Sequence, residues 1–308
     1  MDVSIIIVSY NNLEILNSCI VSLYKHITDI SFEVIIVDNG SDKEKIKEIC
    51  NGYSNLKLIL NEKNVGFAKA NNIGLKIASG KYVLFLNNDT VFIENSIKKV
   101  FDYAEKNKNI ILGCKLLNPD GSWQQSTANY PSLINAWSSN FFLYKFFPHS
   151  KTLNKYHIHS NKVTQPIEVD YVLGAFLFGS KKEIMELNGF DEKFFFYAED
   201  IDLCYRYKKF GGKVIFYPLT SIIHIGGASV VGNQWFKLKN KFIAEIQFYQ
   251  KHYKGLEFYL SILAMYFGNF LRIPIFFLWG LISLKGTHIL RSLYHFKLLF
   301  IYPENLFK

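Results

Sequence analysis

The sequence lacks the cysteine spacings that mark metal clusters and disulfide frameworks. Its 308 residues include only Cys19, Cys50, Cys114 and Cys204, and no two of them have C-x-x-C spacing. We expect buried thiols in a reducing cytosol. The N-terminus also lacks the basic segment and small-residue cleavage site of a signal peptide, so residues 3–8 are interpreted as a first strand.

Two glycine-rich phosphate-binding signatures are missing as well. No G-x-G-x-x-G follows the first apolar run, and G-x-x-x-x-G-K-[ST] occurs nowhere in the chain. These absences remove the main support for dinucleotide binding and for P-loop hydrolysis. Any phosphate that this chain binds is therefore expected to be held by a metal ion or by side chains.

Positive charge is concentrated near the C-terminus. The net charge is +9, and residues 237–308, with ten Lys or Arg and three Glu, contribute +7 of it. A basic chain often suggests nucleic acid as a partner. Here the basic residues lie beside long apolar runs, which fits an anionic membrane surface better, so no nucleic-acid partner is expected.

The apolar part of this tail is long enough to cross a bilayer. Residues 258–284 contain one charge, Arg272, and one proline, Pro274. Both lie near the middle, where they make a single span costly. We therefore predict two amphipathic helices, roughly 256–271 and 275–300, that lie on the membrane surface. A true span, and a soluble core or a contact between copies of the chain, are the alternatives.

The first 110 residues alternate between apolar strands and amphipathic helices. Continuous apolar runs predict strands at 3–8, 32–37, 56–60 and 82–86, and a helix is expected to run from residue 67 to about residue 78. This alternation is typical of an α/β fold with a doubly wound, mostly parallel sheet. Ligands bind beyond the carboxyl ends of the strands in such sheets.

Polar residues follow three of these strands and are expected on one rim of the sheet. Ser9 and Tyr10 end the first strand, Asp38 the second and Asp89 the fourth. Asp89 is a candidate ligand for Mg²⁺ or Mn²⁺, which prefer oxygen donors and share phosphate oxygens. Asp38 could accept the imide N–H of uracil or thymine. Each aspartate also suits an ordinary turn, which is the structural alternative.

An acidic triplet, Glu199, Asp200 and Asp202, opens a predicted helix directly after an aromatic run at 194–197. Acids at a helix start complement the helix dipole, so plain charge patterning is one interpretation. The aromatic run would also keep water away from a carboxylate that accepts a proton from a hydroxyl nucleophile. His224 follows an apolar strand; it is either structural or a neutral third ligand for a metal.

Residues 115–170 have no regular pattern. They include a Trp-Gln-Gln stretch at 123–125 and several large aromatic residues, among them Trp137, Phe141, Phe146 and Phe147. These aromatic residues could contact sugar faces or a lipid tail. The alternative is a small hydrophobic core separate from the main sheet.

Taken in order, these motifs resemble the family 2 glycosyltransferases with the GT-A fold. The resemblance covers roughly residues 1–255, which would be the GT-A domain, with 256–308 as a helical membrane-associating tail. The nearest branch is that of the rhamnosyltransferase-like enzymes, which share N-x-G-F-A, L-N-N-D and H-x-x-G-x-S. The matching segments are 3–12, 37–41, 64–74, 84–90, 174–178, 189–196, 199–202 and 224–229.

The resemblance implies an inverting sugar transfer. Asp200 would be the base that deprotonates the acceptor hydroxyl, with Glu199 and Asp202 as supporting residues. Asp89 would hold a divalent metal, Mn²⁺ or Mg²⁺, on the donor diphosphate. His224 matches a position that completes the metal shell in some relatives.

The resemblance also assigns the nucleotide pocket. Ser9, Tyr10 and Asp38 would line the base and ribose, and Asn71 would lie nearby. One residue departs from the common family pattern, because Asn87 stands where many members carry the first acid of D-x-D. A neutral amide is a weaker oxygen donor, so a modest metal affinity is expected.

The implied donor is a dTDP- or UDP-linked sugar, with rhamnose as a candidate, and the acceptor is a glycan or a lipid-linked saccharide in surface polysaccharide synthesis. Such an enzyme would act in the cytoplasm, peripherally on the inner face of the cell membrane, and could be an oligomer. A sugar nucleotidyltransferase is an alternative, but it needs a glycine-rich basic loop after the first strand. A non-catalytic, membrane-associated sugar-nucleotide-binding protein is another, against which the presence of Asp200 argues.

Overall fold

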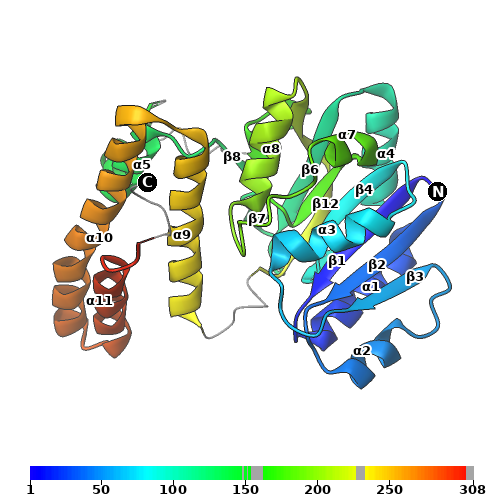
Figure 1. The fold of residues 1–308 in the computed structure, drawn as a ribbon, viewed down its shortest axis with the longest axis horizontal. Coiled ribbons are helices and arrows are strands. Elements are labelled where there is room, and N and C mark those ends of the chain that lie inside the picture. The colour runs from blue at the N-terminus through cyan, green and yellow to red at the C-terminus, as the bar shows by residue number, and fades with distance from the viewer. Residues whose placement is uncertain (148, 151, 154–161, 227–232, 303–308) are drawn as a thin grey trace. The chain divides into compact units, whose positions relative to one another are not determined.

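The chain folds into two compact units (Figure 1). The first contains residues 1–128 and 158–231, and the second contains residues 129–157 and 232–308. The structure is a computed structural model, and it describes residues 1–147, 149–150, 152–153, 162–226 and 233–302. The separate functional boundary that the sequence predicts at residue 255 stays a prediction.

The first unit is built on a mixed sheet with the strand order β3-β2-β1-β4-β11-β6-β12-β5. The four strands predicted at its start are confirmed as β1 (Val3–Ser9), β2 (Phe32–Asp38), β3 (Leu56–Leu60) and β4 (Tyr82–Asn87). All four run parallel, so their carboxyl ends lie along one rim. The other strands are β5 (Thr90–Phe92), β6 (Ile110–Leu117), β7 (Trp123–Gln124), β9 (Ile167–Glu168), β11 (Phe176–Ser180) and β12 (Lys213–His224), with β8 (Thr127–Ala128) and β10 (Tyr171–Val172) paired separately.

Helices cover both faces of the parallel strands. Alternate residues of β1 point to opposite faces, and Ile5 and Ile7 belong to the buried cluster that includes Leu16 of α1. On the other face, α3 approaches so closely that a Cβ at Gly74 would lie 2.6 Å from Ile6. The predicted α/β layering is therefore confirmed. The helices of this unit are α1 (Leu13–His26), α2 (Lys43–Cys50), α3 (Phe67–Ile77), α4 (Ser96–Lys106), α7 (Lys181–Glu186) and α8 (Glu199–Lys209).

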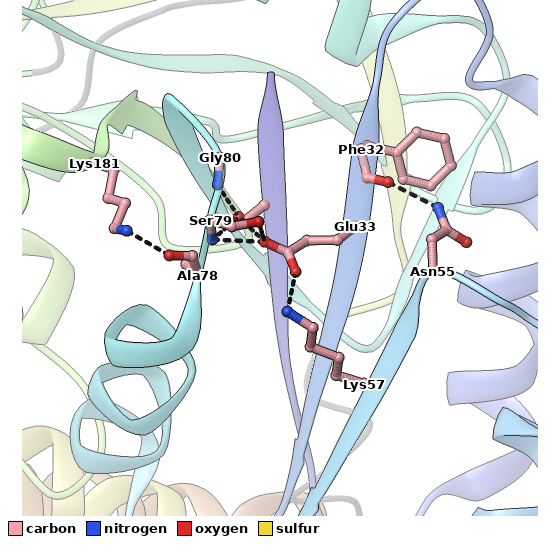
Figure 2. Close-up of polar contacts among 9 residues, drawn as sticks. Phe32, Glu33, Asn55, Lys57, Ala78, Ser79, Gly80 and Lys181 are labelled. Carbon is pink, nitrogen blue, oxygen red and sulfur yellow. Dashed lines mark hydrogen bonds and ion pairs between the residues drawn. The ribbon is translucent and has the colours of Figure 1, made fainter. Parts of the chain in front are cut away.

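A buried carboxylate ties the amino ends of these strands together (Figure 2). Glu33 at the start of β2 accepts hydrogen bonds from the Ser4 hydroxyl of β1 at 2.6 Å and from the Ser79 amide at 2.7 Å. It also pairs with the Lys57 ammonium of β3 at 2.7 Å. Burial alone would raise the pKa of Glu33, but Lys57 and the two serines outweigh it and lower that pKa to about 2.

The second unit is helical and has its own core. Its helices are α5 (Leu133–Asn140), α6 (Leu143–Phe146), α9 (Gln234–His252), α10 (Gly255–Ser283) and α11 (Gly286–Leu298). Trp137 and Phe141 stack on each other with ring centroids 4.9 Å apart and pack against the buried cluster that includes Phe242 and Ile262. For these two aromatic residues the structure confirms the satellite-core interpretation. Phe146 and Phe147 remain exposed.

The predicted helix break near Pro274 is wrong. Helix α10 continues through Pro274 to Ser283, and Leu284, in a left-handed conformation, ends it. A proline removes one backbone hydrogen bond from a helix. The close packing of α11 beyond the proline supports the continuous helix, since a Cβ at Gly280 would lie 2.5 Å from Ile289. By length and composition α10 could cross a membrane, with a third of its most apolar window buried.

Arg272, the single charge of the apolar segment, is satisfied inside this unit. Its guanidinium donates to the carbonyl oxygens of Ser139, Asn140 and Gly268, at 3.0, 3.1 and 2.7 Å. It also lies 4.7 Å from the ring centroid of Phe142. The arginine therefore caps the C-terminal end of α5, which explains why a charge is tolerated in this helix.

Candidate active site

The parallel strands bring the predicted nucleotide residues to one rim of the sheet. In the register of β1, Ser9 lies beside Asp38 of β2, and Val8 lies beside Asn87 of β4. The Asn39 amide donates to the Ser9 carbonyl at 2.8 Å, which holds the loop after β2 against the end of β1. The predicted grouping of these strand ends is confirmed by the register.

The Asp38 carboxylate is buried and organises its own loop. One oxygen accepts from the Gly40 and Ser41 amides, at 3.0 and 2.7 Å, and the other accepts from the Ser41 hydroxyl at 2.5 Å. Three accepted bonds leave about one of the four lone-pair positions of a carboxylate unused. Tyr10, in contrast, is exposed at the end of β1.

The loop after β4 meets the end of β12. The Nε2 atom of His224 lies 3.2 Å from Oδ1 of Asp89 and 3.3 Å from Nδ2 of Asn87. These three predicted residues therefore lie together, although His224 is more than 130 positions from the other two in the sequence. The pairing of Thr90 in β5 with His224 in β12 brings the loop that carries Asn87 and Asp89 next to His224. The neighbouring Gly227 and Ser229 of the H-x-x-G-x-S motif lie outside the described residues.

The donor set at this point fits a divalent cation, though it is small. Two ligands in neighbouring positions of an octahedral shell lie about 3 Å apart, because each sits about 2.1 Å from the ion. The separation of Asp89 and His224 matches that value. Within the described part of the chain no group of three or more His, Cys, Asp or Glu side chains is arranged so that it could hold a metal ion. A cation here would therefore depend on diphosphate oxygens for the rest of its shell.

The acidic triplet begins α8, after two residues in an unfavourable backbone conformation. Tyr197 and Ala198 have φ values of 75° and 64°, a region that costs non-glycine residues about 1–2 kcal/mol each. Strain of this kind persists where the surrounding structure enforces it, which is common at functional sites. These two residues turn the chain directly before α8, where Glu199 is buried and Asp200 is half-buried.

Asp200 is held by two backbone amides. Its Oδ2 accepts from the Gly174 amide at 2.8 Å, and its Oδ1 accepts from the Ile201 amide at 2.8 Å. A Cβ at Gly174 would lie 3.3 Å from the Cβ of Asp200, so glycine permits this close approach. Oε2 of Glu199 is buried and has no hydrogen-bond partner among the described residues.

These contacts decide which acid carries a proton. Burial raises the pKa of Glu199 to about 8, and the neighbouring Asp200 contributes to that rise. Burial also raises the pKa of Asp200, but the amides of Gly174 and Ile201 stabilise its ionised form and oppose that effect. Glu199 is therefore the protonated acid at neutral pH, and the two backbone amides favour the ionised form of Asp200.

One dipeptide connects the histidine side of the site with the acidic pair. Gly174 donates its amide to Asp200, and the next residue, Ala175, accepts a bond from the Asn87 amide at 3.2 Å. The ends of β4 and α8 are thus joined through two consecutive residues. The sequence contained this segment as a matched motif but gave no reason to expect the connection.

The remaining predicted residues have structural contacts. Asp202 is buried and pairs with Arg206 at 2.7 Å, and Arg206 also donates to the carbonyl oxygens of Leu187 and Gly189. Asn71 donates from Nδ2 to the Phe67 carbonyl at 3.0 Å. Asp202 therefore supports the loop before α8 through its arginine partner.

Several buried polar atoms at this rim have no partner among the described residues. They include Oγ of Ser9, Oδ1 of Asn71 and Nδ2 of Asn88. An unpaired buried polar group is unfavourable by about 1–3 kcal/mol, so a ligand that binds at the strand ends would gain by pairing with these atoms. Asn88 was not among the predicted site residues, because the sequence gave it no role distinct from its neighbours.

All four cysteines are buried free thiols, as predicted. Cys19 lies 3.5 Å from the Thr90 hydroxyl, directly under the loop that carries Asp89. Burial raises its pKa to about 12, so it remains a neutral packing residue.

A model of glycosyl transferase family 2 matches residues 4–164, just over half of the chain. The chain belongs to this family. The glycosyltransferase is 27% identical over 231 residues to the rhamnosyltransferase WbbL of Escherichia coli K12, covering 72% of this chain and 83% of that one. It is 26% identical over 211 residues to the N-acetylglucosaminyl-diphospho-decaprenol L-rhamnosyltransferase of Mycobacterium tuberculosis, covering 64% and 67%. It is therefore a sugar-transferring enzyme of the rhamnosyltransferase-like branch.

Solved structures support the GT-A fold of the glycosyltransferase. The crystal structure of GalNAc-T7 with UDP, GalNAc and Mn²⁺ superposes with a TM-score of 0.60 at 17% identity, over 81% of this chain and 48% of that one. Staphylococcus aureus TarS 1–349 in complex with UDP gives 0.51 at 19% identity, over 86% and 70%. This chain thus spans about half the length of the GalNAc-T7 structure. The predicted fold class is confirmed.

Proposed function

We propose that this glycosyltransferase is an inverting, metal-dependent enzyme that transfers rhamnose from a pyrimidine nucleotide diphosphate to a hydroxyl of a lipid-linked or saccharide acceptor. The proposal is supported above all by the connection through Gly174 and Ala175, which links Asp200 to Asn87 in the loop where Asp89 and His224 meet. Both relatives named above are rhamnosyltransferases, and one is named for a lipid-linked substrate.

Asp200 is the proposed base of the transfer. Its ionised carboxylate takes the proton of the acceptor hydroxyl while the hydroxyl oxygen attacks the anomeric carbon. The bond between that carbon and the donor phosphate oxygen breaks on the opposite face, and the diphosphate leaves with the electron pair. The configuration at the carbon is thereby inverted. The bonds from Gly174 and Ile201 hold the carboxylate in place for this role.

Asp89 and His224 are the residues that would hold the divalent cation. When bound, such an ion stabilises the negative charge that develops on the leaving diphosphate. Asn87 presents a neutral amide at the same point, so the protein provides one negative charge rather than two. This composition supports a weakly held Mn²⁺ or Mg²⁺ that binds together with the donor.

The base pocket is proposed at the ends of β1 and β2. The unused acceptor position on Asp38 suits the imide N–H of uracil or thymine, whereas cytosine has no such hydrogen. Ser9 and Asn71 supply unpaired polar atoms at the same rim. A dTDP- or UDP-linked sugar is therefore the proposed donor.

Donor binding and turnover test this function separately. The thermal shift of the full chain is measured with UDP, dTDP and GDP, each with and without Mn²⁺, and a larger shift for the pyrimidines with Mn²⁺ is expected. Turnover is measured with dTDP- and UDP-sugars and a lipid-linked saccharide extract. The change Asp200→Asn should lower turnover about 10²- to 10⁴-fold and preserve the shift. Glu199→Gln is the matched control, and undiminished turnover in Asp200→Asn would refute the assigned base.

The C-terminal hairpin, formed by α10 and α11, is proposed to attach the enzyme to the inner face of the cell membrane. Beyond the part of α10 that contacts α5, apolar side chains are exposed, above all Ile282 and Leu284, at 83% and 91%. Basic residues, Lys285 and Arg291, lie close by in the chain. Apolar side chains next to basic ones are typical of helices that lie on anionic membranes. Surface attachment would suit a lipid-linked acceptor.

Vesicle flotation tests the attachment. Full-length protein is mixed with vesicles containing anionic lipid, and wild-type protein is expected to float with them. The double change Ile282→Glu with Leu284→Glu should release it, because each charge opposes insertion of the hairpin end. Phe210→Glu changes an exposed apolar residue of the first unit and is the control. Equal flotation of all three proteins would contradict the proposal.

A further inference from the structure

Gln124, a residue of β7 with no predicted role, contacts His224 on the side of the ring away from Asp89. Its Oε1 atom lies 2.6 Å from Nδ1 of His224. Its Nε2 atom donates to the His224 carbonyl at 3.1 Å and to Oδ1 of Asn118 at 2.9 Å. The glutamine thus contacts both the backbone and the ring of the same histidine.

The surrounding carbonyl groups determine which end of the amide faces the ring. Asn118 donates from Nδ2 to the Trp123 carbonyl at 3.3 Å, so its Oδ1 is the atom available to Gln124. The His224 carbonyl is likewise only an acceptor. Both acceptors require the NH₂ end of Gln124, which leaves Oε1 directed at the imidazole.

This orientation selects one tautomer of His224. An amide oxygen can only accept, so the Nδ1 atom that faces it carries the hydrogen. In the neutral ring Nε2 then has a lone pair, which faces the Asp89 carboxylate at 3.2 Å; these two acceptors need a cation, or a proton on Nε2, between them. The other tautomer would direct an N–H into the site and block it as a ligand.

We propose that Gln124 is a positioning residue that holds His224 in the Nδ1–H tautomer, so that Nε2 can bind the divalent cation. The inference rests on the proposed metal dependence. Groups that fix the far nitrogen of a metal-binding histidine commonly contribute about 10- to 100-fold to metal affinity. Gln124 lies 100 positions from His224, so no local motif connects the two residues.

Two substitutions and one control isolate the effect. Gln124→Met keeps a similar length but offers no acceptor to Nδ1. Gln124→Glu keeps an acceptor and loses the amide donor, so it should rescue the tautomer. Gln125→Met is the control, because the neighbouring Gln125 is also half-buried and its Nε2 donates to the Thr127 carbonyl instead.

The first measurement needs no metal. Proteins with ¹⁵N-labelled histidine are examined by NMR at a pH where the imidazole is neutral, and a His224→Asn variant assigns the signals. Wild type, Gln124→Glu and Gln125→Met should carry the proton on Nδ1, whereas Gln124→Met should populate both tautomers. Retention of the pure Nδ1–H form in Gln124→Met would overturn the proposal.

The second measurement is Mn²⁺ affinity by electron paramagnetic resonance, with UDP or dTDP present. Gln124→Met should bind Mn²⁺ about 10- to 100-fold more weakly than wild type, and Gln124→Glu and Gln125→Met should stay within about threefold. Equal affinity in all variants would overturn the role of Gln124 in metal binding. If wild type binds no Mn²⁺, the proposed metal dependence fails, and the NMR signals still confirm or refute control of the tautomer.

Discussion

Replacing Glu199 with glutamine should stabilise the folded protein. In the folded chain this carboxyl has a pKa of about 8, against 4.5 for an unperturbed group, because burial and Asp200 disfavour its charge. Folding at neutral pH therefore requires Glu199 to take up a proton. A glutamine side chain at this position would have a similar shape and no such requirement.

The size of the effect follows from the two pKa values. Proton uptake is unfavourable by about 1.4 kcal/mol for each pH unit above the unfolded pKa. Between pH 4.5 and pH 7 this amounts to about 3 kcal/mol. Because the pKa of this acid is raised on folding, the stability advantage of Glu199→Gln over wild type is small near pH 4.5. The advantage grows as the pH rises and levels off above pH 8.

Urea unfolding at pH 5, 6, 7 and 8 measures this difference. The free energy of unfolding of Glu199→Gln should exceed that of wild type by an amount that increases across the series. The control is Glu48→Gln, which changes an exposed glutamate of α2 and should give a difference independent of pH. A Glu199→Gln protein that is less stable than wild type, or whose advantage does not vary with pH, would refute the protonated state of Glu199.

The same substitution separates the two acids in catalysis. At pH 7 wild-type Glu199 is already neutral, so Glu199→Gln should retain most of the activity that Asp200→Asn loses. In wild type the rate should change near pH 8 as a second negative charge appears beside Asp200. The variant should lack this transition. A loss of activity in Glu199→Gln as large as that in Asp200→Asn would instead make Glu199 the base.

Three further outcomes are expected. Asn87→Asp would add a carboxylate about 3.3 Å from His224 and should raise Mn²⁺ affinity about tenfold. Electron paramagnetic resonance with Mn²⁺ and UDP measures this affinity. An unchanged affinity would mean that the cation binds elsewhere. Glu33→Gln should lower the free energy of unfolding at pH 7 by about 3 kcal/mol. This loss should shrink as the pH falls from 4.5 toward 2, because Glu33 of the folded wild-type protein then also becomes protonated. A loss that does not vary with pH would contradict the lowered pKa of Glu33. Ala198→Gly should raise stability by about 1 kcal/mol in urea unfolding, because glycine tolerates a φ of 64°, whereas Ala70→Gly inside α3 should lower it by a similar amount.

The sequence predicted those parts of the structure that follow from local patterns. The apolar runs of β1 to β4 placed Ser9, Asp38 and Asp89 on one rim, because parallel strands end on the same side. It did not predict that Gln124 contacts His224, since a single amide has no characteristic spacing and the contact joins residues 100 positions apart.

Helix α10 illustrates a second limit of local patterns. Pro274 is a helix breaker by local preference, yet the packing of Gly280 against Ile289 of α11 supports the continuous helix. Packing between elements overrides the preference of one residue. The i,i+4 spacing of Asp202 and Arg206 favours their ion pair, but no local pattern predicts that Arg206 also donates to the carbonyl oxygens of Leu187 and Gly189.

The contacts of Glu33 with Ser4, Ser79 and Lys57 affect which parts of this enzyme can accept substitutions during evolution. These contacts link the amino ends of the parallel strands. Ser4 lies five residues, about 17 Å, from Ser9 at the opposite rim of the sheet. Over such a distance the effects of substitutions on stability are expected to add independently. The rim that we propose binds the sugar nucleotide can therefore be changed by substitution while the end of the sheet that holds Glu33 stays unaltered. For directed evolution this makes Glu33 and its partners the region to leave alone, and the loops after β1, β2 and β4 the region to randomise.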